Sequence, residues 1–153
     1  MQWMILPFKR YADFEGRSRR MEFWMFQLLN VIVASVLAGP FVVAVITASA
    51  AAELGGSPDP FEALGTFTLL LTGLYGLYAL VALIPGIAVT VRRLHDRDMS
   101  GWWYLGFAIG GAIPFVGFIA SIAFLVILFL PGTDGANRFG PDPKNPYEED
   151  VFA

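Results

Sequence analysis

The chain has 153 residues, of which 56% are apolar and 15% are charged, and its formal net charge at pH 7 is −3. The length suggests one domain, but a protein with so few charged side chains is poorly suited to be soluble in water. The absence of cysteine excludes a disulfide framework and any cysteine-based metal site.

The first segment, residues 1–22, carries five Lys or Arg residues and three acidic residues. Its first half mixes cations with large apolar side chains, so it could lie as an amphipathic helix on anionic lipid. Because Lys and Arg in short segments are retained in the cytoplasm, we expect this segment to be cytoplasmic.

Three long stretches, residues 23–52, 65–91 and 99–133, contain no Asp, Glu, Lys, Arg or His. Each exceeds the roughly 20 apolar residues that cross the hydrocarbon core of a bilayer. We expect residues 23–52 and 65–91 to be two full transmembrane helices. The loop around residues 55–60 lies in an acidic segment without basic residues, so we expect it to face outside.

The third apolar stretch is too long for one crossing and too short for two. Residues 101–130 would form a helix of about 45 Å, against a core of about 30 Å. Two glycines and Pro114 stand where a break is expected. The stretch is either one long tilted helix kinked at Pro114, or a half-helix over 101–113 followed by a fourth helix over 114–131. We favour the second form, which puts the C-terminus in the cytoplasm.

The sequence therefore predicts an all-α, polytopic membrane protein in three parts. Residues 1–22 form the cytoplasmic N-terminal segment, and residues 23–131 form the transmembrane helical domain. Residues 132–153 form a loop rich in glycine and proline and an acidic tail.

The basic segment at residues 92–98 closes one helix and precedes the next. Arg92 and Asp96 are expected to form an ion pair four residues apart if the helix continues through this segment. Ser100 or Asp98 could cap the following helix by accepting a hydrogen bond from its first free N–H groups. These features describe a stop-transfer signal and a helix cap.

His95, the only histidine, permits a functional interpretation of the same segment. Its titration near neutral pH suits a proton carrier, a metal ligand or a phosphate contact. A metal site would need carboxylates alone as the other ligands, and a nucleophilic triad would need an activated Ser or Thr. We therefore expect no metal, no cofactor and no enzymatic activity.

Three strings of the chain together resemble the signature of a family. They are FEGRSRRMEFW at residues 14–24, RRLHD and SGWW within residues 92–103, and GTDG, NRFG and DP within residues 132–143. Over about residues 8–143, their order and spacing resemble the bacterial inner-membrane family called domain-of-unknown-function family 805, or YhaH-like. The resemblance implies a bacterial plasma-membrane location and supplies no catalytic residue. It suggests that the three strings meet on one membrane face, which requires the third apolar stretch to be a hairpin.

Three kinds of function remain for such a chain. We favour a non-enzymatic module whose cytoplasmic face binds a partner protein or anionic lipid headgroups, because arginine binds phosphate and carboxylate with paired hydrogen bonds. The first alternative is a small transporter or channel working as a homo-oligomer, although the apolar stretches lack the ionisable residues that carriers use. An enzyme acting on lipid headgroups is less favoured, and we expect no nucleic-acid partner. The residues proposed for the cytoplasmic face are Arg17, Arg19, Arg20, Arg92, Arg93, His95, Asp96, Asn137 and Arg138.

Overall fold

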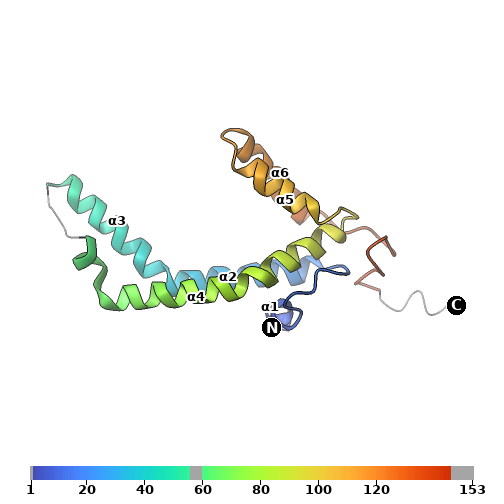
Figure 1. The fold of residues 1–153 in the computed structure, drawn as a ribbon, viewed down its shortest axis with the longest axis horizontal. Helices are drawn as coiled ribbons and strands as arrows, with labels where there is room; N and C mark the ends of the chain where they lie inside the picture. Colours follow the sequence, from blue (N-terminus) through green and yellow to red (C-terminus); the bar gives the residue numbers. More distant parts are fainter. Residues whose placement is uncertain (1, 56–59, 146–153) are drawn as a thin grey trace. The chain divides into compact units, whose positions relative to one another are not determined.

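The fold is all-α in the computed structural model, which describes residues 2–55 and 60–145 (Figure 1). Two stretches, Arg20–Leu37 and Gly65–His95, are long and apolar enough to cross a bilayer by length and composition. The predicted helical membrane architecture is confirmed. Within the described residues the helices are α1 (Gln2–Lys9), α2 (Arg20–Leu37), α3 (Gly39–Glu53), α4 (Pro60–His95), α5 (Trp102–Gly111) and α6 (Val116–Phe129).

The first apolar stretch forms two helices where the sequence predicted one. The stretch predicted as one transmembrane helix over 23–52 is interrupted at Ala38, because α2 ends at Leu37 and α3 begins at Gly39. Pro40 has no N–H to donate and its ring clashes with the preceding turn, so the first helix stops there. Proline suits the first turn of a new helix, which is where it stands in α3. The loop predicted to face outside falls largely on residues 56–59, outside the described residues.

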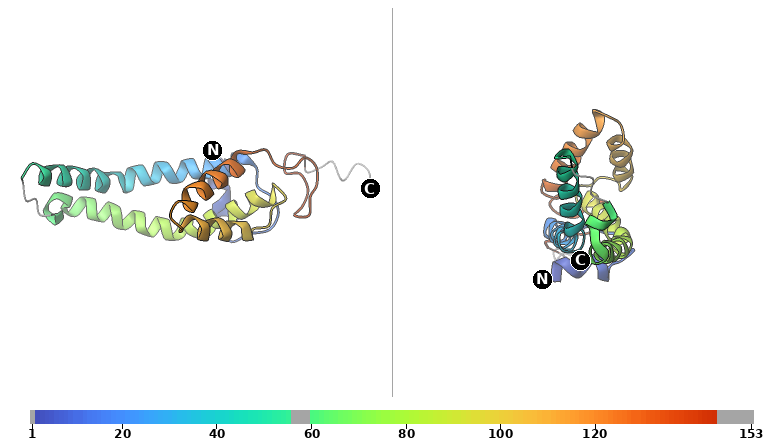
Figure 2. Two further views of the ribbon diagram at one scale, coloured as in Figure 1. Left: turned by 90° about the horizontal axis from the view of Figure 1, so that it is seen from above. Right: turned by 90° about the vertical axis from the view of Figure 1, so that its left-hand side faces the viewer.

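The third apolar stretch is a hairpin of two short helices. α5 and α6 pack against each other and lie side by side in both views of Figure 2. The 10 residues of α5 span about 15 Å and the 14 residues of α6 about 21 Å, so neither crosses a core about 30 Å thick. The chain turns at Phe115, whose φ of 64° leaves the helical region. The predicted break near Pro114 is confirmed, and the single kinked helix is wrong.

Small residues allow the two helices of this hairpin to approach closely. A Cβ atom at Gly117 would collide with the carbonyl of Gly111. A Cβ atom at Gly110 would lie 3.6 Å from the Cβ of Ala120. Close approach of helix backbones through small residues is the usual way in which apolar helices pack in lipid.

The chain divides into two compact units. The first comprises the N-terminal segment up to Phe26 and the chain from Ile84 onward, and the second is Gln27–Leu83. In the second unit most large apolar side chains are exposed, and the Tyr78 hydroxyl donates to Asn30 Oδ1 at 2.7 Å. The first unit holds the hairpin and a small apolar core of Phe23, Phe26, Val89 and Leu128.

Candidate functional site

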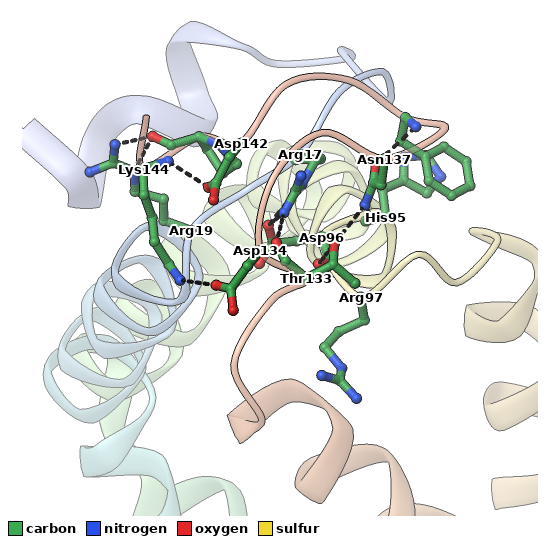
Figure 3. Close-up of polar contacts among 12 residues, drawn as sticks. Arg17, Arg19, His95, Asp96, Arg97, Thr133, Asp134, Asn137, Asp142 and Lys144 are labelled. Atoms are coloured by element: carbon green, nitrogen blue, oxygen red, sulfur yellow. Dashed lines mark hydrogen bonds and ion pairs between the residues drawn. The ribbon is translucent and has the colours of Figure 1, made fainter. Parts of the chain in front are cut away.

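The three polar strings meet in the first unit, at the start of α2, the end of α4 and the loop that follows α6 (Figure 3). We call this cluster the polar cap and define it as residues 13–22, 92–98 and 128–144. Hydrogen bonds between residues 34 to 124 positions apart in the sequence hold it together. The predicted meeting of the three strings is therefore observed.

Asp96 lies at the centre of the polar cap and joins two arginines. Its Oδ1 accepts a hydrogen bond from Arg17 Nε at 3.0 Å, and its Oδ2 accepts one from Arg93 Nη1. Asp96 is 4% exposed, Arg17 6% and Arg93 0%. An isolated charge buried this deeply costs several kcal/mol, so the carboxylate and the two guanidinium groups depend on one another.

Arg17 also fixes the loop that follows α6. It donates to the carbonyl of Gly135 at 2.6 Å and to that of Thr133 at 2.5 Å. The Thr133 N–H donates to the Asp96 carbonyl at 2.8 Å. Gly132 approaches Asp96 so closely that a Cβ atom there would collide with the carboxylate. Gly132 therefore allows the third string to pack closely against Asp96 of the second string.

Arginines from the end of α4 bind the carbonyls at the end of α6. Arg93 donates to the carbonyls of Leu128, at 3.2 Å, and of Leu130. Arg97 donates to the carbonyl of Pro131 at 2.5 Å. Carbonyls in the last turn of a helix have no partner within that helix, and cations there also interact favourably with the helix dipole. These bonds close the hairpin onto the end of α4.

Arg92 binds across to α2 and does not pair with Asp96. Its Nη2 donates to Glu22 Oε1 at 3.1 Å, and its Nη1 donates to the Asp13 carbonyl. Arg92 is fully buried and Glu22 is 3% exposed. The predicted ion pair between Arg92 and Asp96 is wrong, because Arg17 and Arg93 engage both oxygens of Asp96.

His95 and Asn137 join the last turn of α4 to the tail. The Gly16 carbonyl lies 3.2 Å from His95 Nδ1, and because a carbonyl only accepts, Nδ1 carries the proton in this contact. The imidazole stacks on Phe139, with ring centroids 3.9 Å apart and planes 4° apart. Asn137 Nδ2 donates to the His95 carbonyl at 2.9 Å. Figure 3 shows Asn137 beside His95.

Neither of the two residues predicted to cap α5 is its N-cap residue, which is Gly101. The Asp98 carboxylate pairs with Arg138 at 3.1 Å, so Asp98 does not cap the helix. The Ser100 hydroxyl accepts a long hydrogen bond of 3.4 Å from the N–H of Trp102, the first residue of α5. Ser100 thus accepts a hydrogen bond from α5, but a long one and from the position before the N-cap, and Asp98 pairs elsewhere.

Asp142 closes a turn in the tail. Its Oδ1 accepts from the Lys144 N–H at 2.8 Å, and its Oδ2 accepts from the Gly135 N–H at 3.3 Å. The Lys144 N–H is the main cause that holds the Asp142 pKa below its ordinary value; partial burial opposes this and the Gly135 N–H assists it. Lys144 itself lies 3.6 Å from Asp134, whose side chain is 97% exposed.

All the residues proposed for the cytoplasmic face lie in the polar cap, but not all can meet a ligand. Arg17, Arg92, Arg93 and Asp96 are buried and bonded to other parts of the chain, so their side chains do not form an exposed surface. His95 and Asn137 are half-buried, whereas Arg20 and Arg138 are exposed and Arg19 is partly exposed. Whether the accessible residues bind anything stays a prediction.

Glu22 and Thr133 were not among the predicted site residues, yet they are as central to the polar cap as those residues. Glu22 carried a usable signal, since it is an acidic residue directly before a stretch of apolar residues. Such a residue needs a buried cation as its partner. Thr133 contributes mainly its backbone, which a pattern of side chains does not reveal.

Comparison with known proteins places the chain in a family. A family described as "Protein of unknown function (DUF805)" matches residues 11–141. The chain is 38% identical over 144 residues to "Inner membrane protein YhaH" of Escherichia coli (strain K12), covering 94% of this chain and 98% of that protein. It is also 38% identical over 144 residues to "Inner membrane protein YhaI" of the same strain, covering 94% of this chain and 97% of that protein. No solved structure matches. The chain therefore belongs to the DUF805 family and is a helical inner-membrane protein.

Proposed function

We propose that this protein is a non-enzymatic membrane module whose polar cap lies at the cytoplasmic surface and holds anionic phospholipid headgroups. The cap is a compact arrangement of charge at the ends of apolar helices. A headgroup phosphate is the anion that such helix ends meet in a bilayer.

The observation that carries this proposal is a set of three arginines at the rim of the cap that have no acidic partner in residues 2–55 and 60–145. Arg19 donates to the Pro143 carbonyl, Arg20 to the Phe129 carbonyl at 3.4 Å, and Arg97 to the Pro131 carbonyl. Among the residues that the structure describes, none of the three forms an ion pair. Hydrogen bonds to carbonyls leave the positive charge of each guanidinium unneutralised, so this charge is available to an external anion.

The charge of the strings supports the proposed cytoplasmic location. The three strings bond to one another, so they belong on one side of a bilayer. Residues 1–22 and 92–98 both carry more basic than acidic residues, which favours the cytoplasmic side. Near the anionic inner leaflet each exposed Lys or Arg contributes about 1 kcal/mol to the interaction.

The non-enzymatic character is supported by how the acidic groups are used. Glu22 and Asp96 are buried and bind arginines, so neither is free to exchange a proton with a substrate. His95 binds a backbone carbonyl through Nδ1 and stacks on Phe139. These groups hold the cap together.

Lipid analysis tests the binding. The protein is extracted in a mild neutral detergent, and its co-purifying lipids are compared with those of the parent membrane. We expect phosphatidylglycerol and cardiolipin to be enriched over phosphatidylethanolamine by about fivefold, the factor that corresponds to ~1 kcal/mol. A lipid composition equal to that of the membrane would contradict the proposal, and a stoichiometric protein in place of lipid would favour a protein partner.

Single cysteines test the orientation, since the chain has none of its own. Cysteine is placed at Met99, at Ala136, or at Ser57, which lies outside the described residues. An impermeant thiol reagent should label position 57 in intact cells, and positions 99 and 136 only after the membrane is opened. Labelling of position 136 in intact cells would exclude a cytoplasmic cap.

A further inference from the structure

The polar cap contains a pocket of about 210 Å³ between the start of α2 and the tail. Three of its lining residues are cations, Arg19, Arg20 and Lys144, and one is an acid, Asp96. Arg19 and Arg20 come from the first string and Lys144 from the tail, so the pocket exists only because the cap is assembled.

The single carboxylate in the pocket does not cancel its positive charge. Arg17 and Arg93 engage both oxygens of Asp96 from within the cap. Its negative charge is therefore balanced by two buried cations that do not line the pocket. Asp134, 3.6 Å from Lys144, offsets part of the charge of that lysine, but Arg19 and Arg20 remain in excess, so an anion entering the pocket meets a positive potential.

The lining cations also keep hydrogen-bond donors that have no strong partner. Among the residues that the structure describes, Arg20 forms only one hydrogen bond, the 3.4 Å contact with the Phe129 carbonyl. Arg19 uses Nε and Nη2 on the Pro143 carbonyl, and within the described part of the chain its Nη1 has no acceptor. Lys144 lies 3.6 Å from the exposed Asp134, and such surface pairs contribute little.

The N-terminal end of α2 adds to this positive potential. α2 has 18 residues and begins at Arg20, and Met21 also lines the pocket. The first N–H groups of a helix lack partners within it, and the helix dipole places partial positive charge there. The helix end thus reinforces a site that the side chains already define.

We propose that this pocket binds a phosphate group, with Arg19, Arg20 and Lys144 as the residues that contact it. Guanidinium groups bind phosphate oxygens through paired hydrogen bonds, and lysine adds a point charge. The inference rests on the proposed function, because it assigns a defined site to the anionic headgroup. The phosphate can come from a lipid headgroup or from free inorganic phosphate, since both present the same oxygens.

Two matched double variants test the site in the full-length protein in neutral detergent. Arg20→Gln with Lys144→Gln removes two pocket cations that have only weak internal contacts. Lys9→Gln with Arg138→Gln is the control, because it removes one lysine and one arginine that are exposed and lie outside the pocket. Binding of phosphatidylglycerol and of phosphatidylcholine is measured for each by native mass spectrometry.

We expect the pocket variant to bind phosphatidylglycerol about tenfold more weakly than the unmodified protein, and the control to differ from it by about twofold or less. A charge-keeping variant, Arg20→Lys with Lys144→Arg, should retain most of the binding and shows that the loss is not one of folding. Equal losses in the pocket variant and the control would overturn the site while leaving anionic lipid binding intact. No preference for phosphatidylglycerol in the unmodified protein, together with no binding of inorganic phosphate, would overturn both the site and the proposed function.

A competition experiment separates the two sources of phosphate. Inorganic phosphate is added at constant ionic strength, with chloride as the matched salt. If phosphatidylglycerol binds more weakly in phosphate than in chloride, and the pocket variant shows no such difference, the site also binds the free anion. Equal binding in both salts supports a site that needs the lipid. Binding of inorganic phosphate without any preference for anionic lipid supports the pocket and contradicts the proposed function.

Discussion

Replacing Asp96 with asparagine tests whether buried charges hold the polar cap together. The Asp96→Asn side chain would keep nearly the same shape but would carry no charge. Arg17 and Arg93, which are 6% and 0% exposed, would then each lose the only carboxylate that they contact within the described part of the chain. Breaking a buried ion pair by neutralising one partner costs about 3–5 kcal/mol.

The lower end of this range applies here, because each arginine keeps two carbonyl acceptors. Arg17 retains those of Thr133 and Gly135, and Arg93 retains those of Leu128 and Leu130. Hydrogen bonds to carbonyls stabilise a guanidinium but do not neutralise it. We therefore expect the cap to be destabilised by about 3 kcal/mol, which raises the population of its open form about a hundredfold.

Amide hydrogen exchange in detergent measures this opening directly. The Thr133 N–H bonds to the Asp96 carbonyl at 2.8 Å, so it reports whether the tail stays docked. Asp134→Asn is the matched control, because it makes the same chemical change at a carboxylate that is 97% exposed. If both variants exchange the tail amides at about the same rate, the buried charges do not hold the cap and the reasoning fails.

Three further changes probe other contacts of the tail. Gly132→Ala drives a Cβ atom into the Asp96 carboxylate and should destabilise the docked tail by about 1–3 kcal/mol; unchanged exchange of the tail amides would refute the close approach. Phe139→Ala removes the ring stacked on His95 and should weaken the protection of the tail amides against hydrogen exchange by about 1 kcal/mol. Protection equal to that of the unmodified protein would show that the stack contributes nothing. Two backbone N–H bonds lower the pKa of Asp142 in the folded chain. These bonds therefore stabilise the docked tail fully at pH values above the ordinary aspartate pKa near 4, and this stabilisation is lost as the pH falls through the lowered pKa of the folded chain. Asp142→Asn should abolish this pH dependence in tail exchange, and a variant with the original profile would contradict the assignment.

The positions of the helices were largely predictable, because long stretches without charged residues indicate membrane helices. The break between α2 and α3 was not predicted. Gly39 and Pro40 are uncharged, so they do not interrupt the apolar stretch from which the helix was predicted. The hairpin of α5 and α6 was predictable for a different reason. Its length fits neither one crossing nor two, and Pro114 offered the position of the break.

The contacts of the candidate site were predictable only in part. A local rule assigned Arg92 to Asp96, four residues away, whereas the structure pairs Arg92 with Glu22, 70 residues away. Spacing along one helix contains no information about the acidic residue that another helix brings nearby. Burial was equally hidden, because an arginine beside a headgroup and an arginine inside the cap look the same in the sequence.

The buried and the accessible arginines have different physical tasks. In lipid, apolar surface gains little by facing another helix, so apolar packing alone selects weakly among helix partners. Directional bonds from Arg92 to Glu22 and from Arg93 to the carbonyls after α6 do select, because each has one satisfactory geometry. We therefore expect removal of either arginine to destabilise the cap, so a loss of lipid in such a variant would not identify where the lipid was bound. Arg20 and Lys144 contribute little to that framework, so a loss of anionic lipid on their replacement reports the binding site itself.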